Sequence, residues 1–369
     1  MKLHLPSLGL VCLIAWIGNA VSSTAQHGRQ AIIIDTDIMS DVDDVGALAV
    51  ANALHNCGLD DLRGVVINTR SRYGALAASV VNTYFGNGDI PIAAMRPLTD
   101  EAFLDTYAHL RGEYASKLAY DWPRRLNDSA ETPTPVELYR SVLASADKHS
   151  INIISIGFST NLADLLSSGS DDISPLTGCD LVQAKVGELI IMGGQYPSGW
   201  EYNFGGVDPE SVDFVLRHWP RNVPVTFSGV ELGGDIWSGQ TLRKNAPYDS
   251  PVRAAYEWYM GRCDTVQKSW DPVTVLYGVL GLRGFTRIGM QAPLHFANED
   301  GYNSVDATDG SNAWINDSQS HGQHWLSLTN GTTNETVAGL LNQLYTQDPA
   351  AKHCAGLSEV FRSQVAVDD

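Results

Sequence analysis

The chain has 369 residues, which is enough for one large α/β domain or about two domains of ordinary size. Its 42 acidic residues outnumber its 24 Lys and Arg, and the formal charge of −18 argues against nucleic-acid binding because the surface would repel a phosphate backbone. With 44% hydrophobic and 18% charged residues, the composition excludes disordered and collagen-like chains.

The N-terminal segment has the pattern of a secretory signal. Lys2 precedes an apolar run over residues 8–17 that is too short to span a bilayer, and small residues follow it. Ala20 and Ala25 are candidate last residues of the cleaved peptide. We therefore expect a signal peptide over residues 1–26, a mature domain over residues 27–369, secretion, and no membrane anchor.

Two further features agree with the secretory route. Asn-x-Ser/Thr sequons occur at Asn127, Asn316, Asn330 and Asn334. The mature chain keeps four widely spaced cysteines, namely Cys57, Cys179, Cys263 and Cys354. This even number permits up to two disulfides in an oxidising compartment, with three pairings that the spacing does not rank, and buried free thiols are the alternative.

Short apolar runs alternate with amphipathic stretches along the mature chain. We expect strands at residues 31–34, 64–67, 151–156, 188–192 and 223–227, with helices at residues 42–54, 75–84, 161–166 and 209–217. This alternation predicts one α/β domain built on a mostly parallel sheet flanked by helices. Residues 298–334, rich in Gly and Asn, predict a loop-rich C-terminal elaboration that a helix near residues 337–345 closes.

The first predicted strand ends in a dense acidic motif. Five aspartates fall within ten residues: Asp35, Asp37, Asp41, Asp43 and Asp44. Ligands of parallel α/β sheets bind at the carboxyl ends of the strands, and carboxylates packed there without a counter-ion would repel one another. The motif therefore predicts a bound cation, and its oxygen ligands favour Ca²⁺ or Mg²⁺ over zinc.

Two familiar acidic motifs do not fit this segment. An EF-hand loop that starts at Asp35 would need Gly at its sixth position and Glu at its twelfth, where Ser40 and Gly46 stand. The Asp-x-Asp pair is also typical of haloacid dehalogenase phosphatases, but the later Lys and acidic pair that those enzymes need are not evident.

The whole run Asp-x-Asp-x-x-x-Asp-x-Asp-Asp instead resembles the metal-binding signature of the inosine-uridine preferring nucleoside hydrolase family. Further blocks resemble that family in the same order, namely Ser155–Ala163, Met192–Gly194 with Glu201–Asn203 and Asp208–Glu210, and Trp270–Val275. Together the blocks cover about residues 30–290. The resemblance implies a Rossmann-like nucleoside hydrolase fold and cleavage of the N-glycosidic bond of a ribonucleoside to give ribose and free base.

The resemblance also implies a role for each matching residue. The Ca²⁺ ligands would be Asp37, Asp44, Asp271 and the backbone carbonyl of Ile156, and Asp37 would also take a proton from the attacking water. Asp43 would accept a hydrogen bond from the ribose 2′-hydroxyl, while Glu201 and Asn203 would hold further ribose hydroxyls. Carboxylates suit this reaction because positive charge develops on the ribose ring in the transition state.

Several positions depart from the family pattern. The acidic motif is two residues longer than the shortest family version, which introduces Asp41 without an assigned role. Residues 70–73 read Arg-Ser-Arg-Tyr where many members carry Asn, and no additional ribose-binding Asn stands between Gln195 and Trp200. The identity of the sugar is therefore open.

The residue before Asp271 is Trp270, where less base-selective members carry a His. An indole there resembles the purine-preferring branch of the family, in which it stacks on the leaving base. The alternative is that Trp270 is a core aromatic residue. His321 and His324 are candidate acids for the leaving group, or surface histidines.

The leading hypothesis is thus a secreted, Ca²⁺-dependent nucleoside hydrolase that prefers purines and acts on a small-molecule substrate. The alternatives are a hydrolase of another ribosyl or glycosyl compound and a non-catalytic Ca²⁺-binding glycoprotein on the same fold. Retention of Asp37, the implied base, argues against the last. The sequence leaves room for a homo-oligomer.

Overall fold

The computed structural model describes residues 29–103, 113–320 and 322–351. The expected signal peptide, Cys354 and His321 lie outside these residues. No helix in the described ranges is long and apolar enough to cross a membrane.

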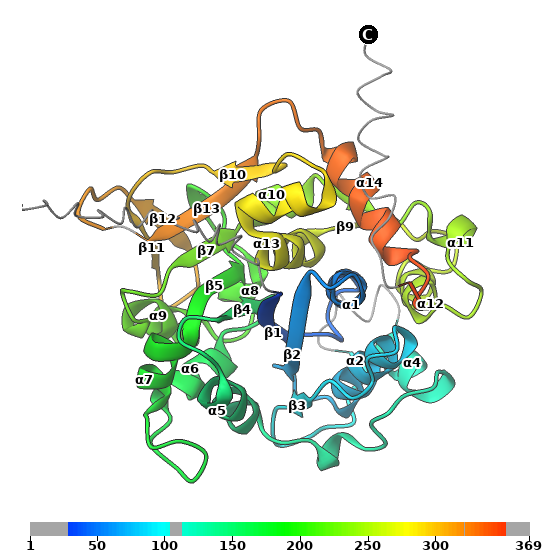
Figure 1. The fold of residues 1–369 in the computed structure, drawn as a ribbon, viewed down its shortest axis with the longest axis horizontal. Coiled ribbons are helices and arrows are strands. Elements are labelled where there is room, and N and C mark those ends of the chain that lie inside the picture. The colour runs from blue at the N-terminus through cyan, green and yellow to red at the C-terminus, as the bar shows by residue number, and fades with distance from the viewer. Residues whose placement is uncertain (1–28, 104–112, 321, 352–369) are drawn as a thin grey trace, which may run out of the picture.

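An eight-stranded sheet runs through the middle of the molecule in the order β10-β13-β7-β5-β4-β1-β2-β3 (Figure 1). Neighbouring strands are parallel except for β10, which is antiparallel to β13 at one edge. The strands are β1 (Gln30–Thr36), β2 (Asp60–Ile67), β3 (Ile92–Ala94), β4 (Ile151–Ser155), β5 (Val186–Met192), β7 (Val225–Ser228), β10 (Leu294–Phe296) and β13 (Gln323–Leu328). The expected mostly parallel α/β fold is confirmed.

Helices cover both faces of this sheet (Figure 1). One face packs against α1 (Asp43–Asn56), α2 (Arg72–Tyr84), α13 (Trp270–Gly284) and α14 (Asn334–Tyr345). The other packs against α5 (Pro135–Ser145), α6 (Thr160–Ser167), α7 (Gly178–Lys185) and α9 (Pro209–His218). Successive side chains of β1 alternate between the two cores, since Ile32 and Ile34 enter the first and Ile33 the second. Because both faces are buried, these strands are continuous apolar runs.

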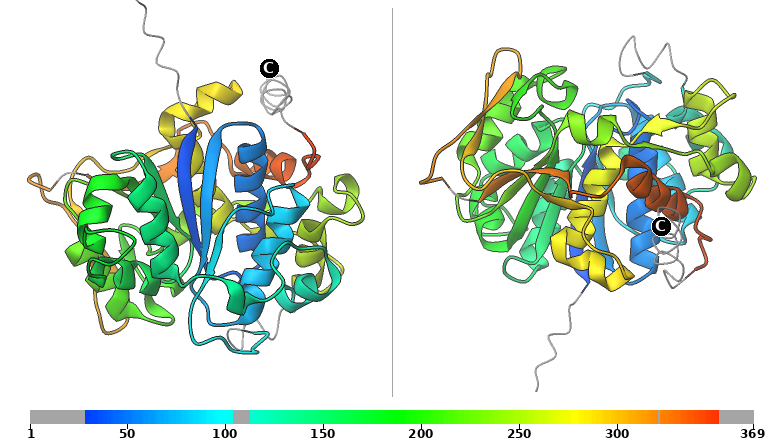
Figure 2. Two further views of the ribbon diagram at one scale, coloured as in Figure 1. Left: turned by 60° about the horizontal axis from the view of Figure 1, so that its bottom comes forward. Right: turned by 90° about the horizontal axis from the view of Figure 1, so that it is seen from above.

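Smaller elements connect these layers and supply parts of the site. The short strands are β6 (Ser198–Gly199), β8 (Trp237–Ser238), β9 (Gln267–Lys268), β11 (Tyr302–Val305) and β12 (Asn312–Ile315). The short helices are α4 (Ala115–Asp121), α8 (Tyr202–Gly205), α10 (Val230–Gly234), α11 (Leu242–Asn245) and α12 (Pro251–Tyr259), with 3₁₀ turns η1 (Ser129–Glu131) and η2 (Phe285–Ile288). Late in the chain, α14 packs beside the early helix α1 (Figure 2).

Residues 298–334 differ from the expected loops, because they include β11, β12 and β13. β13 even joins the central sheet, in parallel with β7. The sequence hides β11 and β12 because two of their inward-facing residues, Asn303 and Asn312, are polar and hydrogen-bond to each other at 3.0 Å. The usual apolar alternation of a strand is therefore absent there.

The first helix begins without a side-chain cap. Helices α5, α9 and α12 each start with a capping hydroxyl or carboxylate followed by Pro, as in Thr134-Pro135. Helix α1 instead follows Val42, whose side chain cannot cap, and its first turn carries Asp43 and Asp44. Negative charge is favourable at the N-terminus of a helix because of the helix dipole. Asp43 and Asp44 can therefore occupy the first turn of α1, beside the pocket, without a side-chain cap.

The cysteines form fewer disulfides than four residues permit. Cys57 is disulfide-bonded, whereas Cys179 and Cys263 are free thiols. Of the cysteines in the described ranges, only Cys57 therefore takes part in a disulfide. Three sequon asparagines, Asn127, Asn316 and Asn330, are exposed, and Asn334 is partly buried at the start of α14.

Candidate active site

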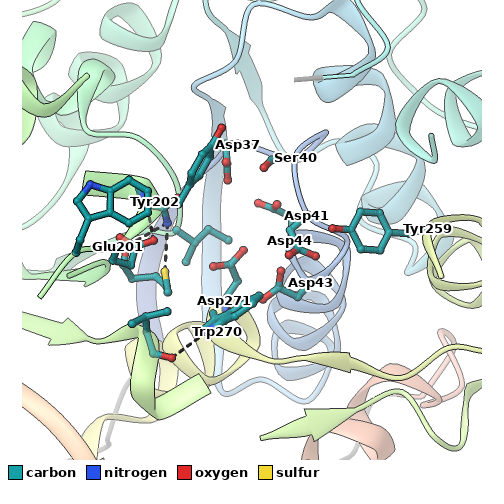
Figure 3. Close-up of a pocket in the computed structure, with 15 residues that line it drawn as sticks. Asp37, Ser40, Asp41, Asp43, Asp44, Glu201, Tyr202, Tyr259, Trp270 and Asp271 are labelled. Atoms are coloured by element: carbon teal, nitrogen blue, oxygen red, sulfur yellow. Dashed lines mark hydrogen bonds between the residues drawn. The ribbon is translucent and has the colours of Figure 1, made fainter. Parts of the chain in front are cut away.

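A pocket of about 320 Å³ opens beside the carboxyl ends of β1, β4 and β5 (Figure 3). Six carboxylates line it: Asp37, Asp41, Asp43, Asp44, Glu201 and Asp271. They come from the loop after β1, the start of α1, the residue before α8 and the start of α13. The fold thus gathers acids that lie far apart in the sequence, as the resemblance implied.

Asp37, Asp44 and Asp271 form a compact buried cluster. Each offers a carboxylate oxygen, and these oxygens lie within 4.8 Å of one another. Asp44 Oδ1 accepts a hydrogen bond from the Thr36 hydroxyl, but Oδ2 is buried without a hydrogen-bond partner among the described residues. Ile156, whose carbonyl the resemblance implies as a ligand, also lines the pocket. An orphaned oxygen within an all-oxygen set fits a hard divalent cation.

The electrostatics of this cluster support the same interpretation. Burial first, and then repulsion from the neighbouring acids, raises the pKa of Asp37 to about 8. The same two causes raise the pKa of Asp44 and of Asp271 well above their usual range. A bound cation would offset both effects and restore the charged carboxylates.

Asp35, the first acid of the motif, does not line the pocket. Its carboxylate accepts hydrogen bonds from the Tyr139 hydroxyl (2.6 Å) and from the side-chain amides of Asn68 (2.7 Å) and Asn161 (3.2 Å). These donors come from α5, from the residue after β2 and from α6. Asp35 therefore links the central sheet to α5 and α6 through hydrogen bonds. Asn161, the Asn of the family's Thr-Asn turn, thus has a structural role here.

Asp43 joins the two acidic segments of the site. Its Oδ2 accepts a hydrogen bond from the backbone N–H of Asp271 at 3.0 Å. The side chain is buried and lines the pocket next to the carboxylate cluster. This contact fixes the start of α13 against the start of α1, so the distance between the pocket acids of the two helices is fixed as well.

Glu201 lies on the wall opposite Asp41 and Tyr259 (Figure 3), and Asn203 lines the same pocket. Glu201 caps the short helix α8, because its carboxylate accepts the backbone N–H groups of Asn203 (2.7 Å), Gly194 (3.1 Å) and Phe204 (3.2 Å). Burial raises its pKa to about 7, against the lowering effect of these N–H groups. The Asn203 amide donates to the Met192 carbonyl at 3.3 Å, so it is held in place beside the pocket.

The Met-Gly-Gly block has a packing role beneath this wall. A Cβ added to Gly193 would lie 2.2 Å from the Phe204 ring, which leaves no room for a side chain. Gly194 adopts a φ of 77°, a conformation that favours glycine. The two glycines therefore let α8 approach the end of β5 and place Glu201 over the pocket.

Trp270 is both a pocket wall and a packing residue. Its indole Nε1–H donates to the Val230 carbonyl at 2.9 Å, and the ring packs partly against the hydrophobic core. The same side chain lines the pocket beside Asp271. The Lys268 ammonium lies 5.1 Å from the ring centre. The two interpretations of Trp270 in the sequence are thus not exclusive.

Asp41, which the sequence left without a role, also faces the pocket. Its Oδ1 accepts hydrogen bonds from the backbone N–H of Val42 (2.6 Å) and from the Gln267 amide (2.9 Å). Gln267 lies on β9, just before α13. The longer motif thus adds a second hydrogen bond between the start of α1 and the segment before α13, next to the one between Asp43 and Asp271.

Sequence patterns do not predict some of the residues that line the pocket. Trp200 and Tyr259 line it, yet Trp200 lies between β6 and α8 and Tyr259 ends the short helix α12, and neither belongs to a recognisable pattern. Tyr202 also lines it, within the Glu201–Asn203 block of the resemblance. Residues 70–73 do not line it, since Ser71 caps α2 and Arg72 pairs with Asp100. His324 does not either, because it stacks on Phe296 at a ring separation of 4.1 Å.

Comparisons with known proteins agree with this arrangement. The model of the inosine-uridine preferring nucleoside hydrolase family matches residues 32–333. No curated protein sequence matches the chain. Among solved structures, a plant nucleoside hydrolase is similar with a TM-score of 0.62 and 18% identity, over 86% of this chain and 99% of that one.

Two bacterial structures are similar as well. A purine-preferring ribonucleoside hydrolase from Gardnerella vaginalis has a TM-score of 0.61 and 14% identity, over 89% of this chain and 99% of that one. An inosine-uridine preferring nucleoside hydrolase from Bacillus anthracis has a TM-score of 0.57 and 13% identity, over 86% and 99%. At these identities the structures establish the fold, and the family match adds the activity class. The chain therefore belongs to the inosine-uridine preferring nucleoside hydrolase family and is a hydrolase of N-glycosyl compounds.

Proposed function

We propose that the protein is a secreted, Ca²⁺-dependent ribonucleoside hydrolase that prefers purine nucleosides. The observation that carries this proposal is the buried cluster of Asp37, Asp44 and Asp271, whose oxygens lie within 4.8 Å of one another in a pocket that also holds Glu201 and Asn203. Acids for a cation and groups for a sugar thus line one cavity.

The cluster and Ile156 would hold the ion. Bound Ca²⁺ would supply positive charge that orients the attacking water and the ribose hydroxyls. Asp37 lines the pocket and would accept the proton of that water as it attacks C1′. The surrounding carboxylates would stabilise the positive charge that develops on the ribose ring as the bond to the base breaks.

Asp43, Glu201 and Asn203 would position the sugar. Asp43 lies beside the cluster and would accept from the 2′-hydroxyl, while Glu201 and Asn203 would hold hydroxyls at the opposite wall. Both sides are fixed by backbone hydrogen bonds before substrate arrives. Such preorganisation lowers the entropic cost of reaching the transition state.

The purine preference rests on Trp270. Its ring borders the pocket next to Asp271, and the bond from its Nε1 to Val230 fixes the plane of the indole. A fixed aromatic face gains more from stacking on a bicyclic base than on a single ring.

Secretion rests on the N-terminal signal pattern and on the exposed sequons Asn127, Asn316 and Asn330. Expression of the full chain in a eukaryotic secretory host tests it. We expect the protein in the medium, starting after residue 20 to 26, with a mass that falls on treatment with an N-glycosidase. Retention in the cell with Met1 intact would contradict secretion.

The activity is tested by incubating purified protein with inosine, guanosine, adenosine, uridine and cytidine and measuring the free base. We expect base release that a chelator stops and added Ca²⁺ restores. Asp172→Asn, which alters an exposed acid outside the pocket, serves as the control and should behave as wild type. Release that persists after exhaustive chelation would contradict the Ca²⁺ dependence.

One observation favours a second candidate, the hydrolysis of another ribosyl or glycosyl compound. The Asn203 amide donates to Met192 rather than into the pocket, and residues 70–73 leave the pocket without the family's usual Asn. A parallel panel of 2′-deoxynucleosides and other glycosides of the same bases distinguishes the two. Faster release from a non-ribose substrate would support the second candidate.

A further inference from the structure

Asp41 lines the pocket but stands apart from the carboxylate cluster of Asp37, Asp44 and Asp271. Figure 3 shows its carboxylate directed into the pocket, with Tyr259 on the same wall and Glu201 and Tyr202 on the opposite one. A pocket acid outside the cluster is available for a contact with the substrate.

Four hydrogen-bond partners hold Asp41 in place. Val42 N–H and the Gln267 amide both donate to Oδ1, at 2.6 and 2.9 Å. The backbone carbonyl of Asp41 accepts from the Tyr114 hydroxyl, and the Tyr259 side chain is a further hydrogen-bond partner of the carboxylate. Because Val42 N–H and the Gln267 amide both donate to Oδ1, Oδ2 keeps acceptor capacity for a ligand in the pocket.

The position of the base follows from the sugar and rests on the proposed function. If Asp43 holds the 2′-hydroxyl and Glu201 with Asn203 holds the other end of the ribose, then C1′ lies on the Asp43 side, because it is bonded to C2′. The base attached to C1′ therefore projects from the Asp43 end of the pocket. Asp41 and Trp270 both line the pocket near that end, because Asp41 is two residues from Asp43 and Trp270 precedes Asp271, whose N–H donates to Asp43.

We propose that Asp41 recognises the base by accepting a hydrogen bond from an N–H group on the edge of its six-membered ring. The ligand class is a nucleoside whose base carries such a donor, for example the N1–H of hypoxanthine or guanine. A fixed carboxylate suits this role because hydrogen bonds to charged acceptors are stronger than those between neutral groups. Trp270 contacts the face of the base and Asp41 its edge.

The test compares inosine with purine riboside, which has the same ring system but no N–H donor on that edge. Asp41→Ala should lower kcat/KM for inosine by about tenfold to a hundredfold and change that for purine riboside less than about twofold. Asp172→Ala is the matched control. Equal losses on both substrates, or no loss on inosine, would overturn the proposal.

Asp41→Asn sharpens the test. Because Val42 N–H and the Gln267 amide donate to Oδ1, the new amide should keep its oxygen there and present its NH₂ group to the pocket. The acceptor becomes a donor, so the ratio of kcat/KM for inosine to that for purine riboside should fall below the ratio in Asp41→Ala. A ratio equal to that of wild type would overturn the proposal.

Two further measurements separate recognition from folding and from the proposed function. The substrate comparison is made at saturating Ca²⁺, because the charge of Asp41 acts on Asp37 and its removal should weaken Ca²⁺ binding modestly. Abolition of Ca²⁺ binding in Asp41→Ala, measured by calorimetry, would show that Asp41 acts through the cluster and contradict the inference. Gln267→Leu, which removes the donor to Asp41 Oδ1 and the acceptor of the Lys268 N–H, should give the same substrate pattern with a smaller effect. If the wild type releases no base from any nucleoside, the proposed function fails; if it does and the variants lack the pattern, only this inference fails.

Discussion

Asp35 and Asp44 belong to one acidic segment and are both fully buried, yet their surroundings differ. Asp35 accepts hydrogen bonds from three neutral donors, whereas Asp44 has one from Thr36 and a second oxygen without a partner among the described residues. Burial raises the pKa of both carboxyls, but only at Asp44 does repulsion by Asp37 and Asp43 add to it. A buried acid therefore indicates a ligand site only when its hydrogen bonds and charge are left unmatched.

The largest effect expected from this difference is that of Asp44→Ala. Removing a carboxylate from the cluster should abolish both Ca²⁺ binding and base release, since Asp37 and Asp271 alone cannot surround the ion. The metal-free protein should melt no lower than wild type, because one repelled charge is gone. Calorimetry and thermal melting check both points, and an unchanged Ca²⁺ affinity would remove Asp44 from the ligand set.

Asp37→Asn should have the next largest effect. The carboxamide cannot accept the proton of the attacking water and contributes no charge to the ion, so turnover should fall by about 10²–10⁴-fold. Circular dichroism and Ca²⁺ titration should show a folded protein that still binds the ion more weakly. Turnover near that of wild type with saturating Ca²⁺ would exclude Asp37 as the base.

Asp35→Ala should produce the opposite pattern to Asp44→Ala. It removes the acceptor of the Tyr139 hydroxyl and one of the two acceptors of each amide, Asn68 and Asn161, which keep their bonds to backbone carbonyls. At about 1 kcal/mol for each group, the free energy of unfolding should fall by about 3 kcal/mol. Denaturant unfolding measures this loss. A variant Asp35→Ala that unfolds with the free energy of wild type but has lost Ca²⁺ affinity would contradict the structural role of Asp35 and its contrast with Asp44.

Much of the fold and of the site can be predicted from the sequence, because both depend on order along the chain. The apolar runs of β1, β4 and β5 and the acids that follow them identify a parallel sheet and its ligand edge. The family match confirms the resemblance that four blocks indicated. Asp37, Asp44 and Asp271 do converge, and their role as metal ligands stays a prediction.

The rest depends on contacts that sequence order does not encode. The motif alone gives no sign that Asp35 faces α5 and α6 while Asp44 faces the pocket, since both belong to one acidic segment. Tyr259 reaches the pocket from the end of α12 and Trp200 from between β6 and α8, and the buried pair Asn303 and Asn312 conceals two strands. In each case a tertiary contact, not local periodicity, decides the position of the residue.

The pH dependence of the metal-free protein extends the comparison to all the buried acids. Burial raises the pKa of Asp35 and Glu201 to about 7 and that of Asp37 to about 8, from ordinary values of 3.8 to 4.5. At pH values between the ordinary pKa values and the raised ones, the folded state binds more protons than the unfolded state. The free energy of unfolding therefore falls as the pH rises through this range.

We therefore expect metal-free protein to melt at a higher temperature at pH 5 than at pH 8. Added Ca²⁺ should stabilise it more at pH 8, because binding requires deprotonated carboxylates. Asp44→Ala should show a shallower dependence, since its cluster holds one carboxylate fewer. Equal melting temperatures at the two pH values in wild type would contradict the raised pKa values.

Trp270→Ala should have the smallest effect, and it separates base recognition from packing. If the indole stacks on the base, kcat/KM for inosine should fall by more than that for uridine, with a loss of about 1–3 kcal/mol of stacking. If the indole only packs, the cavity should lower the free energy of unfolding by about 3–5 kcal/mol and impair both substrates alike. The partial exposure of the ring and its place beside Asp271 favour the first outcome.

Trp237→Ala is the matched control for Trp270→Ala, because Trp237 also lies near the Lys268 ammonium, at 5.6 Å, but does not line the pocket. Equal losses on inosine and uridine together with a large drop in melting temperature would withdraw the purine preference, while leaving the carboxylate cluster and its contrast with Asp35 untouched.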